Sequence, residues 1–176
     1  MVSKPRSEAG PVRLSRAIRG GITRNHPRDL WKIVTCADTS FLFSLYGNDA
    51  HSPRVLAWMK SQRSALTVTA LGEYELGNAL RFSEFRRGIA PGEAAMFWAQ
   101  FEADRASGRL QLHVCNLADV VEEAKRLSST YTLTGGHRGF DILHVAAALN
   151  LKAQQLLTFG ENQKKLAEAE GLIVPI

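Results

Sequence analysis

Acidic side chains stand at three places in the chain where they could bind an ion or a substrate. Asp38 follows the β-branched run "WKIVTCA", Glu73 and Glu75 lie in "ALGEYELGNALR", and Asp141 lies in "GFDILHVAAALN". In open α/β sheets, ligands bind outside the carboxyl ends of the strands, so acids that closely follow predicted strands are the first candidates. We therefore take these positions as the candidate functional site.

Each of these acids also has a purely structural explanation. Asp38 is suited to cap the helix that follows it, a common role for Asp. A carboxylate at Asp141, in the first turn of a predicted helix, is stabilised by the helix dipole. Glu73 and Glu75 could be solvated helix charges, and helical spacing does not choose between them, because each shares a helix face with apolar residues.

His144 stands one helical turn after Asp141, and such a D-x-x-H pair could bind a metal. The helix is predicted to be buried, because an apolar stripe runs along it, formed by Ile142, Val145, Ala146 and Leu149. A histidine beneath such a helix is more often packed and hydrogen-bonded to backbone or to a carboxylate. We favour this second interpretation.

Strands and helices alternate after residue 33. Short strands are predicted within residues 31–38, 64–71, 108–115, 154–159 and 172–176. Helices are predicted within residues 52–63, 70–81, 90–108, 117–131, 139–152 and 161–171. This alternation predicts an α/β fold with a central parallel sheet and helices on both faces.

The chain divides into a basic leader, residues 1–33, and one domain, residues 34–176. Residues 1–32 carry a net charge of +6 and the whole chain +5, so the remainder sums to −1. The leader is rich in Arg, Gly, Pro and Ser, and we expect it to be disordered. It could be a basic arm for nucleic acid or an organelle-targeting leader. A misassigned start, with translation beginning at Val34, is the explanation that we favour.

The composition is that of an ordinary globular protein, with 45% apolar and 22% charged residues among 176. No stretch approaches the roughly 18 consecutive apolar residues of a membrane span, and the N-terminus has no secretory core. We therefore expect a cytoplasmic protein. Cys36 and Cys115 lack nearby partners at zinc-binding spacing, so we expect two reduced, buried thiols, and a disulfide that links them is the alternative.

The segments "ADTSFL", "EYELGNALR" and "FDILHVAAAL", in this order, resemble the PIN-domain family. More narrowly, the chain resembles the VapC-like toxin ribonucleases of bacterial toxin–antitoxin pairs. The resemblance covers residues 34–176, including the ending "LLTFGENQKKLAEAEGL". It implies a PIN-like three-layer fold, and it selects Glu75 over Glu73, because Glu75 occupies the family's E-x-x-N-A-L position.

The resemblance implies an endoribonuclease that hydrolyses RNA phosphodiester bonds with Mg²⁺ or Mn²⁺. Asp38, Glu75 and Asp141 would be the catalytic acids and the metal ligands, Glu75 directly or through a water. Oxygen ligands without His or Cys select these cations, which activate water and neutralise charge that develops on the phosphate. Ser40 would orient Asp38 or a water, and Thr39 is expected to be structural.

Gly160 departs from the family pattern, which has a further Asp after the phrase "TF". Three interpretations are open. Glu161 could compensate as an additional metal ligand, three acids could suffice, or the site could be catalytically silent. In the last case the chain would be a PIN-like module that binds RNA or a protein without cutting. We expect retained activity.

Partners also follow from the resemblance. Beyond the RNA substrate, for which Arg138 is the candidate phosphate contact, it implies an antitoxin protein and a homodimer, and no membrane. Large apolar residues on the helical segments would suit such protein contacts. They are Trp58, Met59, Phe82, Phe85, Met96, Phe97 and Trp98.

Overall fold

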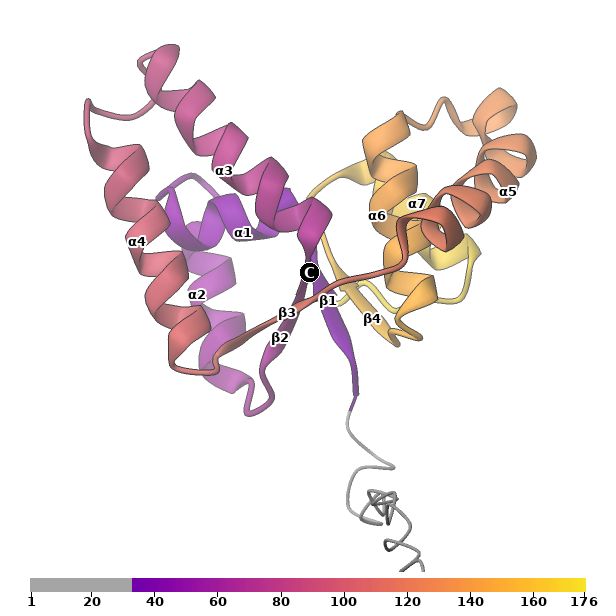
Figure 1. Cartoon of the computed structure of the whole chain (residues 1–176), viewed down its shortest axis with the longest axis horizontal. Helices are drawn as coiled ribbons and strands as arrows, with labels where there is room; N and C mark the ends of the chain where they lie inside the picture. The colour runs from indigo at the N-terminus through magenta and orange to yellow at the C-terminus, as the bar shows by residue number, and fades with distance from the viewer. Residues whose placement is uncertain (1–32) are drawn as a thin grey trace, which may run out of the picture. The chain divides into compact units, whose positions relative to one another are not determined.

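A computed structural model describes residues 33–176, and it contains a four-stranded parallel sheet in the order β3-β2-β1-β4 (Figure 1). The strands are β1 (Thr35–Ala37), β2 (Leu66–Thr69), β3 (Leu110–His113) and β4 (Gln155–Leu157). Cys36 of β1 lies opposite Thr67 of β2 and Leu156 of β4. The predictions for residues 1–32 lie outside the described residues.

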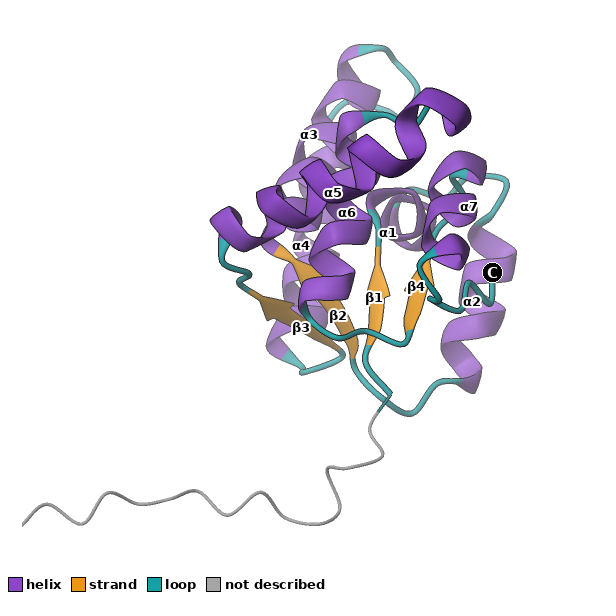
Figure 2. Cartoon of the chain, turned by 90° about the vertical axis from the view of Figure 1, so that its right-hand side faces the viewer, coloured by secondary structure: helices purple, strands orange, loops and turns teal. Residues whose placement is uncertain are grey.

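Helices cover both faces of the sheet, and their arrangement confirms the predicted three-layer α/β architecture. Figure 1 shows α1 to α4 on one side of the sheet and α5 to α7 on the other, and in Figure 2 α5 and α6 lie in front of the strands. The helices are α1 (Thr39–Tyr46), α2 (Ser52–Ser61), α3 (Ala70–Phe85), α4 (Glu93–Ala106), α5 (Leu117–Gly135), α6 (Gly139–Asn150) and α7 (Glu161–Ala169).

Alternate residues of the central strands feed two separate cores. Ala37 and Leu157 join the core formed with α1 to α4, whereas Cys36 and Leu156 join the core formed with α5 to α7. This division follows from the two-residue period of a strand. Both faces of β1 and β2 are accordingly buried, as expected for the centre of a parallel sheet, whereas Gln111 and His113 of the edge strand β3 are exposed.

Two strands end in a side chain that caps the next helix, and these caps fix where the site lies. Asp38, directly after β1, accepts a hydrogen bond from the Phe41 amide at 2.9 Å. Thr69, at the end of β2, accepts one from the Gly72 amide at 3.1 Å. Because α1 and α3 each begin directly after a strand, their first turns lie at the carboxyl edge of the sheet.

The predicted fifth strand, within residues 172–176, is wrong. The segment makes an isolated bridge, in which Ile173 pairs with Gln155 in parallel. Pro175 has no amide hydrogen, and it cannot continue the ladder beyond this point.

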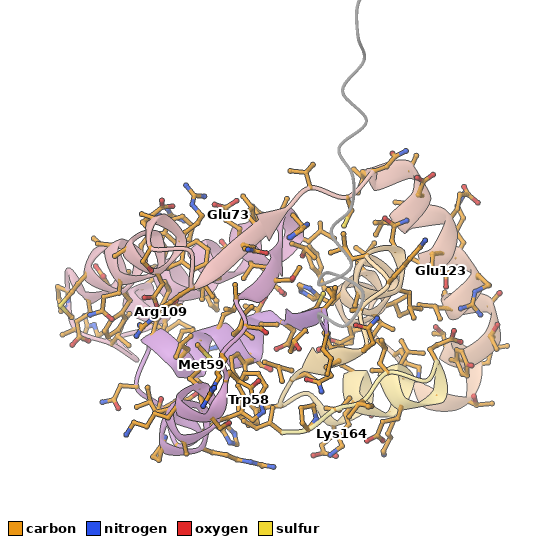
Figure 3. The ribbon with its side chains drawn as sticks, turned by 90° about the horizontal axis from the view of Figure 1, so that it is seen from below. Trp58, Met59, Glu73, Arg109, Glu123 and Lys164 are labelled. Atoms are coloured by element: carbon orange, nitrogen blue, oxygen red, sulfur yellow. The ribbon has the colours of Figure 1, made fainter. Side chains whose placement is uncertain are left out.

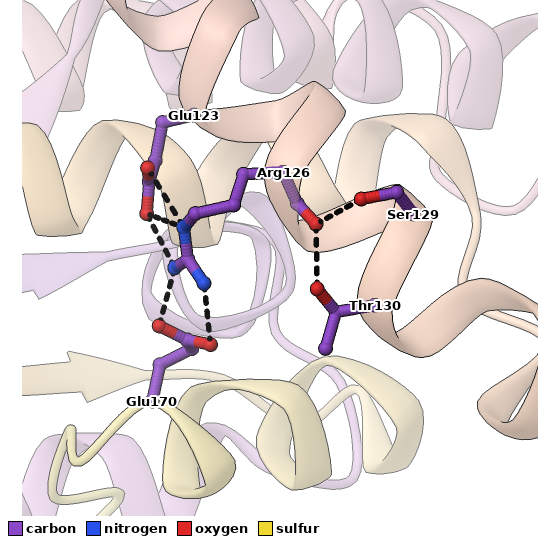
Figure 4. Close-up of polar contacts among 5 residues, drawn as sticks. All are labelled: Glu123, Arg126, Ser129, Thr130 and Glu170. Atoms are coloured by element: carbon purple, nitrogen blue, oxygen red, sulfur yellow. Dashed lines mark hydrogen bonds and ion pairs between the residues drawn. The ribbon is translucent and has the colours of Figure 1, made fainter.

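An ion-pair network joins α5 to the residue that follows α7 (Figure 4). The Nη2 atom of Arg126 lies 2.6 Å from Oε1 of Glu123 and 2.5 Å from Oε2 of Glu170. The pKa of Glu170 is lowered, chiefly by its hydrogen bond with Arg126. Arg126 is about half exposed, so we assign the network a contribution of at most about 1 kcal/mol to stability.

Both cysteines are free thiols, as predicted, but only Cys36 is fully buried, since Cys115 is partly exposed. Burial raises the pKa of Cys36 to about 12. Among residues 33–176, no helix combines the length and the apolar character needed to cross a membrane.

Candidate active site

Asp38, Glu75 and Asp141 line one cavity of about 460 Å³. They come from three elements: Asp38 from the end of β1, Glu75 from the second turn of α3, and Asp141 from the first turn of α6. The structure thus brings the three predicted acids to one place at the carboxyl edge of the sheet. Such an edge is where open α/β sheets bind their ligands.

Asp38 is held in one orientation by three neighbouring groups. Its Oδ1 accepts hydrogen bonds from the Phe41 amide and from Oγ of Ser40 at 2.8 Å, and its Oδ2 accepts one from Oγ1 of Thr158 at 2.7 Å. The side chain is only 4% exposed. Burial raises the pKa of Asp38, and these hydrogen bonds partly oppose the rise. The position therefore favours positive charge beside the carboxylate.

Glu75 is bonded to two side chains from other elements. Its Oε2 accepts a hydrogen bond from Oγ1 of Thr39 and lies 2.6 Å from Nε2 of His144. These bonds lower the pKa of Glu75, with His144 the larger cause. His144 is buried, so it is the packed, hydrogen-bonded histidine that we favoured from the sequence. Thr39, expected to be structural, contacts a candidate catalytic acid instead.

Glu73 points to a different part of the molecule. It makes an ion pair of 2.6 Å with Arg105 of α4, and it is labelled in Figure 3, which shows the molecule from below. It is not one of the residues that line the acid cavity. The orientation of α3 thus separates the two glutamates that helical spacing could not separate.

The donor atoms of this site fit a hard divalent cation in their chemistry. Three carboxylates supply oxygen ligands, and His144 is engaged with Glu75, so Mg²⁺ or Mn²⁺ is favoured over zinc. Within residues 33–176, no three acidic, His or Cys side chains are arranged closely enough to hold an ion together. Asp38 and Glu75 are each hydrogen-bonded to neighbouring side chains, Thr158 and His144. To bind a cation, Asp38 would have to share an oxygen that already accepts a hydrogen bond, whereas Oε1 of Glu75 is outside the bonds with Thr39 and His144.

Gly160 also lines the cavity, as the N-cap residue of α7. Its φ of −78° is ordinary for any residue, so the backbone does not require glycine here. A Cβ atom at this position would lie 3.3 Å from Oγ1 of Thr158 and 3.4 Å from Oε1 of Gln163. Glycine leaves space for these two polar side chains. Glu161 is exposed and does not line the cavity.

Thr158 and Gln163 are site residues that the sequence analysis missed. Oγ1 of Thr158 lies 3.0 Å from Oε1 of Gln163 and accepts a hydrogen bond from the Gly160 amide at 2.9 Å. Gln163 is 2% exposed, and its Nε2 atom has no hydrogen-bond partner within the described part of the chain. The available signal was its spacing from Leu166 and Ala167, which places Gln163 on the buried face of α7.

Ser40 and Arg138, the two other residues predicted to belong to the site, lie in different surroundings. Ser40 donates to Asp38 and accepts a hydrogen bond from the Phe159 amide at 2.8 Å, so it also ties the end of β4 to α1. Arg138 is the N-cap residue of α6, three positions before Asp141. It is exposed and does not line the cavity.

The apolar residues singled out in the sequence divide into two groups. Phe82, Phe85 and Met96 are exposed, with Phe85 at 81%. The others, Trp58, Met59, Phe97 and Trp98, pack in or against the core of α1 to α4, and Trp58 and Met59 are labelled in Figure 3. A second cavity of about 660 Å³ lies between α3 and α4, lined by Phe85 and Trp98 among others. The antitoxin and the homodimer remain predictions for this surface.

Comparison with protein families gives one match, in which the model described as PIN domain covers residues 35–169. A search of curated proteins finds no match.

Solved structures share this fold at low sequence identity. VapC20 of Mycobacterium tuberculosis, described as a toxin that cleaves the sarcin–ricin loop, is 18% identical, with a TM-score of 0.60 over 79% of this chain and 96% of that chain. VapBC2 of Rickettsia felis, bound to a DNA fragment from its promoter, is 14% identical, with a TM-score of 0.55 over 81% and 97%. A toxin–antitoxin complex from Klebsiella pneumoniae is 13% identical, with a TM-score of 0.54 over 81% and 98%.

Proposed function

The chain belongs to the PIN-domain family, and from this premise we propose that it is an endoribonuclease that hydrolyses RNA phosphodiester bonds with Mg²⁺ or Mn²⁺. The observation that carries the proposal is the meeting of Asp38, Glu75 and Asp141 around one cavity. A set of carboxylates at a sheet edge is suited to a divalent cation and to phosphate chemistry.

Asp38, Glu75 and Asp141 would hold the cation. When bound, the cation would lower the pKa of a water and neutralise charge that develops on the phosphate. Asp38 contributes a fixed orientation, because Ser40 and Thr158 each donate to one of its oxygens. Rigid support of this kind keeps a ligand in the geometry that it needs.

His144 and Thr39 favour the ionised form of Glu75 and hold its side chain in one orientation. Their bonds all go to Oε2, so Oε1 is the oxygen that can face a cation or its water. The depressed pKa of Glu75 means that the carboxylate stays charged at neutral pH. Arg138, near Asp141, is proposed as a contact for an RNA phosphate.

The biological role that we propose is that of the toxin of a toxin–antitoxin pair. The solved structures with this fold include a toxin described as cleaving the sarcin–ricin loop and a toxin–antitoxin complex. An antitoxin protein is accordingly the proposed partner, and a homodimer is the proposed assembly. The exposed Phe82, Phe85 and Met96 supply apolar area for such contacts.

A second candidate function is that of a PIN-like module that binds RNA or a protein without cleaving it. The observation that favours it is Gly160, which lines the cavity where the family has a further acid, together with the exposed position of Glu161. In this case the three acids would still face the bound partner, but the site would lack catalytic power.

RNA cleavage distinguishes the two candidates. Antitoxin-free protein is incubated with a panel of structured RNAs in Mg²⁺ or Mn²⁺, with Asp38→Ala and Glu73→Ala purified in parallel. A ribonuclease at this cavity predicts cutting that needs the metal, disappears in Asp38→Ala and persists in Glu73→Ala. Equal cutting by all three proteins indicates a contaminating nuclease. Absence of cutting by folded wild-type protein favours the binding module.

A further inference from the structure

Three rings are stacked in a row. The row runs from Phe41 of α1, in the protein core, to the rim of the cavity that Asp38, Glu75 and Asp141 line. Phe41 is fully buried, and its ring lies 6.4 Å from that of Phe159 at an interplanar angle of 14°. The ring of Phe159 lies 4.2 Å from that of His51 at 13°. The ring of Trp58 packs edge-on against the ring of Phe41, with the two centroids 5.7 Å apart. His51, the outermost ring, is exposed, and both His51 and Phe159 line the cavity that contains Asp38.

Asp49 fixes the backbone that carries His51. Its Oδ1 accepts hydrogen bonds from the amides of His51 at 2.8 Å and Ser52 at 3.1 Å. Its Oδ2 accepts one from Oγ of Ser44 at 2.8 Å. Ser44 belongs to α1, the helix that Asp38 caps. The outer ring is therefore tied, through one short network, to the same helix as the catalytic acid.

We propose that His51, backed by Phe159, is a stacking platform for an unpaired base of the RNA, next to the phosphodiester that is cleaved. This inference rests on the proposed ribonuclease function and adds the feature of the substrate that the site selects. Proteins that recognise unpaired RNA stack its bases on aromatic or histidine rings. A base within a duplex has both faces covered, so the platform selects a loop, a bulge or a single strand.

The position of the platform is what connects stacking to cleavage. His51 and Asp38 line the same cavity, so a nucleotide whose base stacks on His51 would extend its phosphate into the cavity that the acids line. The backbone that carries both rings is positioned before RNA binds, since the Phe159 amide donates to Ser40 and the His51 amide to Asp49, and the two rings already stack. A preformed platform loses little conformational entropy on binding.

Base stacking is measured with hairpin RNAs that carry 2-aminopurine at each loop position in turn, because stacking quenches its fluorescence. Binding to the full chain is followed in EDTA, so that the RNA stays intact. We expect quenching at one or two loop positions. His51→Ala should weaken binding about 5- to 100-fold, the range for loss of one stacked base, and remove the quenching. His51→Trp should preserve both.

His113→Ala is the matched control, because His113 is also exposed but does not line the cavity. It should bind RNA like the wild type. Absence of quenching at every loop position, or equal binding by His51→Ala and the wild type, overturns the platform. So does a His51→Trp protein that is as weak as His51→Ala, because the ring nitrogens would then be what matters.

Cleavage in Mn²⁺ separates the platform from the proposed function. If the wild type quenches 2-aminopurine and never cuts, the ribonuclease proposal fails while the platform stands. If it cuts, His51→Ala should raise KM by a similar factor of about 5 to 100 and leave kcat nearly unchanged. A cutting enzyme whose KM is unaffected by His51→Ala contradicts the platform alone.

Discussion

Nε2 of His144 lies 2.6 Å from Oε2 of Glu75, and this contact joins α6 to α3 across the candidate site. Each helix carries one of the proposed metal ligands, Asp141 on α6 and Glu75 on α3. The bond fixes the side chain of Glu75 relative to α6. It also leaves one oxygen of Glu75 outside its hydrogen bonds with His144 and Thr39.

The two glutamates of α3 should differ sharply in their effect on cleavage. Glu75→Gln keeps a hydrogen-bonding side chain of the same size but removes the charge, and we expect RNA cleavage to fall by about 100-fold or more. Glu73→Gln should change cleavage less than about twofold, because Glu73 pairs with Arg105 away from the cavity. Comparable losses in both variants would contradict the assignment of Glu75.

The contribution of the hydrogen bond between Glu75 and His144 to the stability of the fold should depend on pH. The folded protein lowers the pKa of Glu75 below its ordinary value of 4.5, so the ionised form is the one that folding favours. Its contribution to stability is therefore complete above about pH 4.5 and is lost as the pH falls through the lowered pKa.

The measurement is the difference in unfolding free energy between the wild type and Glu75→Gln, at several pH values. We expect a constant difference near neutral pH that shrinks in acid. In a His144→Phe background, the acid dependence should be much weaker, because the main cause of the lowered pKa is gone. A difference that grows as the pH falls would contradict the structure.

The strands of the sheet were predictable because each strand is indicated by the residues of its own short segment. The strands at residues 35–37 and 155–157 lie within short β-branched or leucine-rich segments, and all of their residues except Gln155 are buried. The segment at residues 172–176 is also rich in β-branched and leucine residues, but it pairs only at Ile173. The hydrophobic pattern does not reveal the effect of Pro175, which has no amide hydrogen with which to continue the ladder.

The site was predictable only in part. Asp38 stands at a strand end, which the sequence displays, whereas the choice of Glu75 over Glu73 depends on how α3 is rotated against α4. Helical spacing alone left both possible, and resemblance to a family decided. The bond between Glu75 and His144 joins residues 69 positions apart, and no periodicity encodes such a contact.

Removing the charge of Asp38 should stabilise the metal-free protein while abolishing cleavage. Asp38→Asn keeps the helix cap, since Asn and Asp cap about equally well. It also keeps one oxygen for Ser40, and the hydroxyl of Thr158 can accept from the new amide. What it removes is a buried charge, whose cost is visible in the raised pKa of Asp38.

We expect the Tm of metal-free Asp38→Asn to exceed that of the wild type by a few degrees at neutral pH, at about 2–4 °C for each kcal/mol. Because the folded pKa is raised, the gap should close as the pH falls toward the ordinary Asp value of 3.8. A lower Tm for the variant at neutral pH would show that the charge is stabilised by groups other than those described.

Gln163 and Thr158 should respond differently to loss of their polar atoms. Gln163→Met removes a buried Nε2 that has no partner among the described residues, so stability should be unchanged or rise by about 1 kcal/mol. Thr158→Val removes a donor to Asp38, and cleavage should fall about 10- to 100-fold. Chemical denaturation and initial cleavage rates measure the two effects. A loss of more than about 1 kcal/mol in Gln163→Met would contradict this expectation and would show that the polar atoms of Gln163, including Oε1 beside Thr158, stabilise the fold.

Binding of Mn²⁺ should stabilise the protein through the three acids and not through Glu161. A ligand that binds only the folded state raises stability by RT ln(1 + [L]/Kd), about 1.4 kcal/mol at ten times Kd. For a chain of this size, that is a rise in Tm of about 3–6 °C. Asp141→Asn should abolish the rise, because it removes one ligand and leaves the cap position of α6 intact.

Glu161→Gln is the matched control, since Glu161 is exposed at the start of α7 and does not line the cavity. It should show the wild-type rise in Mn²⁺. If Glu161→Gln loses the rise as fully as Asp141→Asn does, then Glu161 turns toward the cation when it binds and compensates for Gly160. If the wild type itself shows no rise at millimolar Mn²⁺, the three acids do not form a metal site.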